Sequence, residues 1–147
     1  MRALLALALA CCATGAQARV ASYLPQTGLP RFIAEKFDIA SIRSSLGPRR
    51  QPGQHHFSDL GIAIASADEQ RVVLKSKGWV YTIAVFSVGD INGDGIRDVA
   101  VCFSDDGRGA GGRYFAQEPL LLTRYGATGP LIAIAYRMED DRCRRVP

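Results

Sequence analysis

The chain has few of the features on which nucleic-acid-binding proteins and propeller proteins depend. Its formal charge is only +4, and its basic residues are scattered apart from Arg49-Arg50 and a cluster within 142–145. A nucleic-acid-binding domain normally presents a basic face together with a recognisable motif. Neither is present, so we expect no nucleic-acid partner. Internal repeats are also missing, which excludes a full propeller because that fold needs several blades.

Histidine is equally scarce, since His55 and His56 are the only two in the chain. Adjacent residues of an extended segment point in opposite directions, so the pair does not predict a zinc site. Either imidazole could act as the base for a serine nucleophile at Ser44, Ser45 or Ser58. The G-x-S-x-G elbow of many hydrolases is absent, and a surface loop is the simpler interpretation. A secreted hydrolase with a His55 or His56 base stays open as an alternative function.

The longest apolar run of the chain lies at its N-terminus. The chain starts with a positive Met1-Arg2, continues with apolar residues over 3–13 and reaches the small-residue pattern Ala16-Gln17-Ala18. This order is typical of a cleaved export signal, and the run is too short to span a bilayer. We therefore expect residues 1–18 to be a signal peptide and residues 19–147 to form one domain with no transmembrane segment.

A lipid anchor is the alternative for this segment, because Cys11 could be acylated after cleavage. Ten residues would make a very short signal, which favours soluble export. Cleavage after residue 18 would leave two cysteines, Cys102 and Cys143. In an oxidising compartment such a pair predicts a disulfide. The open alternative is a buried Cys102 and a free Cys143.

Hydrophobic spacing predicts an α+β fold. Apolar residues recur at helical intervals over 31–46, which indicates a broken helix whose second part Asp38 could cap. Gly47-Pro48 ends it, and residues 47–56 read as a loop. β-branched and aromatic runs predict strands at 60–65, 71–75, 79–88, 99–103, 114–125 (interrupted at Pro119) and 131–136. Short turns join these runs, so we expect an antiparallel β-meander of about five strands with a short N-terminal helical segment packed on one face.

Three glycines, Gly107, Gly109 and Gly112, match the pattern G-x-G-x-x-G. The dinucleotide-binding fingerprint also requires a helix after the glycines within a βαβ unit. Here a strand-like segment begins at Tyr114 instead. A hairpin loop is therefore expected, and no nucleotide cofactor.

One acidic loop, Asp90-Ile91-Asn92-Gly93-Asp94-Gly95-Ile96-Arg97-Asp98, carries the strongest functional signal. Oxygen-bearing side chains alternate along it, and calcium takes six to eight such hard ligands. The predicted metal ligands are the side chains of Asp90, Asn92, Asp94 and Asp98 and the backbone carbonyl of Ile96. The alternative is a solvated acidic hairpin turn without an ion.

The loop does not fit an EF-hand, because that motif needs a Glu at its twelfth position and a helix on each side. The twelfth position is Val101, and both flanks are rich in β-forming residues. The spacing instead resembles the DxNxDGxxD calcium loop of FG-GAP and VCBS repeats. The resemblance covers about a dozen residues and implies a calcium site between two strands.

More diffusely, the segments at 45–50, 88–103, 107–112 and 117–125 resemble small exported bacterial proteins of unknown function, an uncharacterised family that implies no activity. With the export signal, this resemblance implies a periplasmic or extracellular location. We expect an exported calcium-binding structural or binding module of the bacterial cell envelope. Its partner would be an envelope protein or a glycan, and the sequence does not predict an enzyme.

Two further observations concern ligand binding. Aromatic residues in and near the predicted strands could line a carbohydrate or peptide groove, although such residues are more often part of a core: Trp79, Tyr81, Tyr114, Tyr125 and Tyr136. A second acidic pair, Asp105-Asp106, lies seven residues beyond Asp98, about 23 Å along an extended strand. It is therefore expected at the opposite end of the sheet from the acidic loop.

The export signal leads to the first testable prediction. Protein made with its native N-terminus should be recovered as a chain that starts at Arg19, because signal peptidase would cut after Ala18. Intact-mass spectrometry of the secreted product measures this directly. A product that starts at Cys11 and carries acyl chains would establish the lipoprotein alternative.

Overall fold

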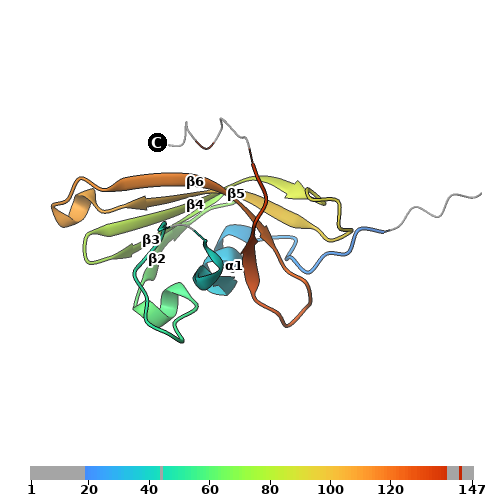
Figure 1. Cartoon of the computed structure of the whole chain (residues 1–147), viewed down its shortest axis with the longest axis horizontal. Coiled ribbons are helices and arrows are strands. Elements are labelled where there is room, and N and C mark those ends of the chain that lie inside the picture. The colour runs from blue at the N-terminus through green and yellow to red at the C-terminus, as the bar shows by residue number, and fades with distance from the viewer. Residues whose placement is uncertain (1–18, 44, 139–142, 144–147) are drawn as a thin grey trace, which may run out of the picture.

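The structure, a computed structural model, describes residues 19–43, 45–138 and 143. Seven strands form one curled sheet in the order β1-β7-β6-β5-β4-β3-β2, and one short α-helix lies within its concave side (Figure 1). The strands are β1 (Phe37–Asp38), β2 (Ala63–Ala67), β3 (Arg71–Ser76), β4 (Trp79–Gly89), β5 (Asp98–Asp106), β6 (Phe115–Thr123) and β7 (Leu131–Ile134).

The sheet is mixed, so the expectation of a purely antiparallel meander of about five strands is wrong. Strands β2 to β7 pair antiparallel with their neighbours in sequence order. The two-residue β1 then pairs parallel with β7, with Phe37 opposite Leu131. Sequence periodicity misses β1 because two residues are too short to show an alternating pattern.

The predicted broken helix over 31–46 is shorter than expected. Helix α1 covers Leu29–Lys36, with a proline in its first turn, a position that suits the fixed φ of proline. It ends at Phe37, which is fully buried and enters the sheet. Asp38 does cap a second short helix, the 3₁₀ helix η1 (Ile39–Ser41), by accepting a hydrogen bond from the amide of Ala40 at 2.9 Å.

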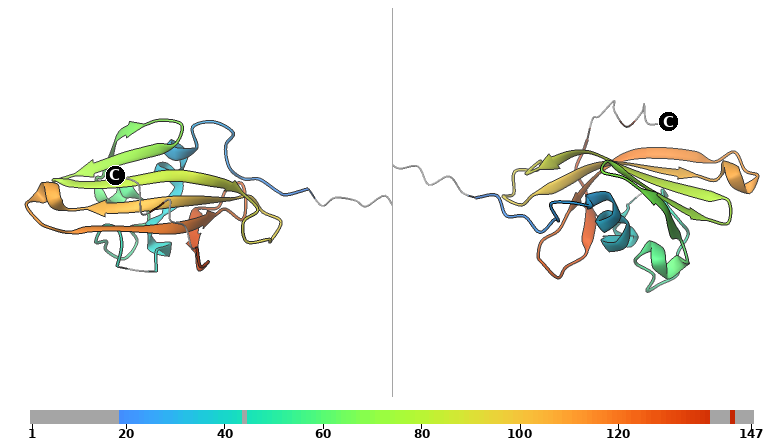
Figure 2. Two further views of the ribbon diagram at one scale, coloured as in Figure 1. Left: turned by 90° about the horizontal axis from the view of Figure 1, so that it is seen from above. Right: turned by 180° about the vertical axis from the view of Figure 1, so that it is seen from behind.

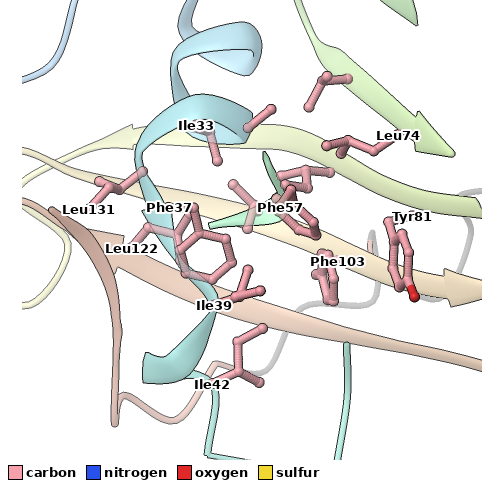
Figure 3. Packing of buried hydrophobic residues seen from close by; sticks show 14 of the residues in the cluster. Ile33, Phe37, Ile39, Ile42, Phe57, Leu74, Tyr81, Phe103, Leu122 and Leu131 are labelled. Carbon is pink, nitrogen blue, oxygen red and sulfur yellow. The ribbon is translucent and has the colours of Figure 1, made fainter. Parts of the chain in front are cut away.

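The core lies between α1 and the concave face of the sheet (Figure 3). Alternate residues of β5, Val99, Val101 and Phe103, face this side and are fully buried. The 3₁₀ helix η2 (Phe57–Leu60) contributes Phe57, whose ring centroid lies 6.2 Å from that of Phe103. Burial of such side chains stabilises the fold by about 1.5–3 kcal/mol each.

Strand β6 runs through Pro119 without the expected interruption. Proline lacks a backbone N–H and is tolerated only where a strand has an open edge. Strand β7 pairs with β6 only at residues 121–123. Among the described residues, Pro119 thus has β5 on one side and no strand on the other, which is why the strand can continue.

The predicted disulfide is present between Cys102 and Cys143, with the two Cα atoms 5.1 Å apart. Cys102 alternates with Val101 and Phe103 along β5, so it points to the face away from α1. The bridge attaches Cys143 to that face. Residues 1–18, on which the signal-peptide and lipid-anchor predictions depend, lie outside the described residues.

The disulfide closes a loop with a sequence separation of 41. The chain-entropy account assigns such a loop about 4 kcal/mol of stabilisation through the unfolded state. Reduction should therefore lower the urea midpoint of unfolding by a corresponding amount. The Cys143→Ser variant should unfold at this lower midpoint, and added reductant should not change it. Equal midpoints for the oxidised and reduced native protein would show that the bridge does not stabilise the fold.

Candidate functional site

The acidic loop connects β4 to β5 at one end of the sheet (Figure 2, yellow). Asp98 is the first residue of β5, and the other loop residues project beyond the paired strands. Carboxylate oxygens of Asp90, Asp94 and Asp98 all lie within 4.8 Å of one another. Oxygens that share one calcium ion are separated by at most about 5 Å, twice the usual bond length of 2.3–2.6 Å. The three carboxylates are therefore close enough to bind the same ion.

Backbone amides of the loop shape this cluster. The amide of Ile91 donates to Asp98 Oδ2 at 3.1 Å, and the amide of Gly95 donates to Asp90 Oδ2 at 3.0 Å. Gly93 and Gly95 adopt φ values of 78° and 81°, which residues with a Cβ rarely do. The glycines thus allow the chain to turn tightly enough for its amides to face the carboxylates.

Two carboxylate oxygens in this loop have no hydrogen-bond partner. The Asp98 side chain is fully buried, and its Oδ1 accepts no hydrogen bond from the described residues. Oδ1 of Asp90 is buried and unpartnered in the same way. None of the ion pairs among the described residues involves this cluster. A buried carboxylate without a counter-charge is unfavourable, so the arrangement favours a bound cation.

The donor set of the loop consists only of oxygen atoms. Such sites suit hard cations, whereas sites for zinc or copper use imidazole or thiolate ligands. The structure brings the three predicted aspartates together. Asn92 lies beside them, since its amide nitrogen donates to Asp94 Oδ2 at 2.9 Å. Its role as a ligand, and that of the Ile96 carbonyl, stay predictions.

Two segments distant in sequence hold the loop in place. Ala21 forms a parallel bridge with Ile96, with its amide donating to the Gly95 carbonyl at 2.8 Å. The Tyr136 hydroxyl donates to the carbonyl of Ile91 at 3.2 Å. Sequence reasoning missed both contacts, because neither residue carries a local signal that links it to the loop.

The two histidines do not form a serine–histidine site among the described residues. The ring Nδ1 of His55 lies 3.1 Å from a carboxylate oxygen of Asp38, and that of His56 lies 3.0 Å from the carbonyl of Phe37. Their backbone amides both donate to Asp59, which lowers the pKa of that carboxyl. These contacts cap η2 and connect it to β1. Neither imidazole is hydrogen bonded to a described serine hydroxyl; Ser44 lies outside the described residues.

The glycine-rich segment forms a 3₁₀ turn, η3 (Arg108–Ala110), between antiparallel β5 and β6, so it is not a dinucleotide-binding loop. A Cβ at Gly109 would lie 2.5 Å from the carbonyl oxygen of Gly78 in the β3–β4 turn. Only glycine allows this approach.

The Arg108 guanidinium holds the pKa of Asp106 at about 2 through their hydrogen bonds.

A pocket of about 990 Å³ opens on the concave side of the sheet, at the end that carries the β3–β4 turn and lies opposite the acidic loop. Trp79, Tyr81 and Tyr114 line it, as does the segment 45–49 that follows η1. Cross-strand register places Tyr81 beside Asp105. Asp105 thus lies at the end of the sheet opposite the acidic loop, as predicted. The other two aromatic candidates, Tyr125 and Tyr136, do not line this pocket.

Asp105 is 1% exposed. The sequence predicts its place at the end of the strand but not its burial. Its Oδ2 accepts a hydrogen bond from the amide of Gly47 at 2.9 Å, while Oδ1 has no partner among the described residues. The pKa of this carboxyl is raised, mainly by burial. The hydrogen bond from the Gly47 amide lowers it in part, and the nearby Asp106 adds a smaller increase. Burial, with a smaller contribution from Asp105, also raises the pKa of Tyr81 to about 12.

Comparison of the chain with protein-family models, curated proteins and solved structures finds no match. The resemblance of the acidic loop to FG-GAP and VCBS repeats therefore stays a prediction. No helix of the described residues combines the length and the apolar character needed to cross a membrane.

The raised pKa of Asp105 predicts how stability depends on pH. Because the folded state holds this proton more tightly than the unfolded chain, the contribution of Asp105 to the free energy of unfolding decreases as pH rises from about 4 through the folded-state pKa. The Asp105→Asn variant cannot lose a proton there. The melting temperature of the variant minus that of the unmodified protein should therefore increase as pH rises across this range. A difference that stays constant with pH would contradict the raised pKa of Asp105.

Proposed function

We propose that this protein is an exported calcium-binding module in which one ion, held by residues 90–98, fixes the end of the sheet. The observation that carries the proposal is the buried, unpartnered Oδ1 of Asp98 within the cluster of three carboxylates. Calcium satisfies such an oxygen directly, and it accepts the irregular geometry of a loop better than magnesium does.

The ion would act on the structure through its position between β4 and β5. These two strands form the longest pairing in the sheet, from Val80 opposite Asp106 to Gly89 opposite Asp98. Without a cation, the three carboxylates repel one another at the open end of that pairing. Binding would remove the repulsion and also secure Ala21 and Tyr136, which contact the loop backbone.

Export supports calcium as the ion. Extracellular calcium modules bind in the range of about 10⁻⁴–10⁻³ M, a range in which weak sites are occupied outside the cytosol. The Cys102–Cys143 disulfide is compatible with an oxidising compartment of the same kind. The module would act by binding a partner of the cell envelope, with the calcium ion as a structural component.

Calcium should raise the melting temperature of the native protein. At a concentration about 100 times Kd, a ligand that binds only the folded state adds about 2.7 kcal/mol, which corresponds to about 10 °C in a domain of this size. The Asp94→Ala variant should lose this response. Asp68→Ala is the matched control, because Asp68 also accepts backbone hydrogen bonds in an exposed turn but lies outside the loop. Identical melting curves of the unmodified protein in EDTA and in excess calcium would refute the proposal.

Terbium luminescence tests the location of the ion. Terbium replaces calcium at oxygen-rich sites and emits when a nearby tyrosine transfers excitation to it. Tyr136 lies against the loop, so it should sensitise bound terbium, and calcium should displace the signal. Tyr136→Phe should reduce the emission but keep the calcium-induced thermal shift, whereas Tyr125→Phe should change neither. Emission that persists unchanged in Asp94→Ala would place the ion elsewhere.

A further inference from the structure

The pocket at the far end of the sheet has an aromatic wall. The Trp79 and Tyr81 rings are stacked with centroids 6.4 Å apart and planes at 15°, and the ring of Tyr114 lies 5.6 Å from Trp79. Gly107 supports the indole, since a Cβ there would lie 2.7 Å from the ring. Tyr114 is 41% exposed. Such rings present flat apolar faces beside polar hydroxyl groups, a surface that suits amphipathic ring-shaped ligands.

The same pocket combines positive charge with a buried hydrogen-bonding group. Arg49 and Lys77 line it, and neither forms an ion pair with any described residue. Asp105 lies in the lining with one unpartnered, buried oxygen. A carboxylate on the ligand would pair with the cations, and a hydroxyl group would satisfy Asp105.

The backbone at Lys77 gives an independent indication. Lys77 has φ 47° and Gly78 has φ 85°, so both central residues of the β3–β4 turn are left-handed. Two-residue turns of this kind strongly prefer Asn, Asp or Gly at the first position. Lysine is less favourable there, and the Lys77 side chain forms no ion pair with the described residues that would compensate. A residue kept in an unfavourable conformation at a pocket indicates a role in that pocket.

We propose that this pocket binds an acidic saccharide, with a sugar ring packed on Trp79 and Tyr114 and a uronate carboxylate held by Arg49 and Lys77. The proposal names the ligand of the binding module and in that respect rests on the proposed function. The pocket volume of about 990 Å³ lies near the upper end of the roughly 300–1,000 Å³ of small-molecule sites. It therefore suits a short oligosaccharide. An acidic peptide would use the two cations but has no sugar ring to pack on the aromatic wall.

Tryptophan fluorescence, excited at wavelengths that tyrosine does not absorb, reports on this pocket, because Trp79 is the only tryptophan in the chain. The native protein is titrated with trimers of galacturonate, glucuronate and mannuronate and with their neutral counterparts. At least one uronate trimer should give a saturable change in fluorescence. Its neutral counterpart should bind at least about tenfold more weakly, which is the loss expected when a charge-assisted contact is removed. No response to any uronate trimer, or an equal response to hexaglutamate, would overturn the proposal.

Matched variants identify the contacts by isothermal titration. Arg49→Gln should weaken binding of the uronate trimer about tenfold, whereas Arg50→Gln should not, because Arg50 does not line the pocket and donates to the Ala40 carbonyl. Tyr114→Ala should likewise weaken binding, with Tyr125→Ala as its control. Equal effects within either pair would contradict the assigned contacts.

Lys77→Asn provides a readout that a purely structural role would not give. Asparagine suits the left-handed turn, so the melting temperature should rise, yet the affinity for the uronate trimer should fall. Unchanged affinity would overturn the role of Lys77.

Titrations are repeated in calcium and in EDTA, with a calcium–sugar titration to correct for ions bound by the uronate. Sugar binding without a calcium-induced thermal shift would refute only the calcium site, and the reverse result would refute only the saccharide site.

Discussion

The structure depends on a central strand that is buried on both faces and carries a buried carboxylate near each end. Eight of the nine residues of β5 are buried, among them Asp98 at its start and Asp105 near its end. A buried carboxylate is costly unless hydrogen bonds or a counter-charge compensate it. The chain supplies hydrogen bonds to one oxygen of each residue and leaves the other oxygen without a partner. Both candidate sites are located at these two carboxylates.

The two ends of β5 compensate their carboxylates differently. At Asp98, the amides come from the adjoining hairpin loop, and two further carboxylates concentrate negative charge there. At Asp105, the amide comes from Gly47, a residue 58 positions away, and the pocket lining combines aromatic rings with Arg49 and Lys77. The first environment favours a metal ion, whereas the second raises the pKa of the carboxyl through burial and leaves one of its oxygens able to hydrogen bond to a ligand. The same residue type thus has two roles because its neighbours differ.

Stability follows from what covers β5. Helix α1 and the segment around Phe57 cover the concave face with apolar side chains, and the disulfide attaches Cys143 to the opposite face. A domain of this size buries a smaller fraction of its surface than a larger one, so cross-links contribute a substantial share of its stability. In our proposal, calcium adds a second cross-link, at the open end of the longest strand pairing.

The sequence by itself determined the features that depend on neighbouring residues. Strands β3 and β4 follow from runs of β-branched and aromatic residues, the acidic loop from alternating oxygen-bearing side chains and glycines, and the disulfide from the two cysteines left after the expected cleavage. Three of the five predicted metal ligands, Asp90, Asp94 and Asp98, are brought together, because a tight loop fixes their proximity locally.

Only the tertiary structure decided the features that depend on register and distant contacts. The helix ends at Phe37 because this residue pairs with Leu131 of β7. Tyr81 meets Asp105 because β4 and β5 pair in one register, and a shift by one residue would turn either side chain to the other face. The pocket and the burial of Asp105 follow from these pairings and from Gly47. Hydrophobic periodicity carries no information on which strands meet or in what alignment, so the sequence could suggest the aromatic residues of a groove but not select those that share one.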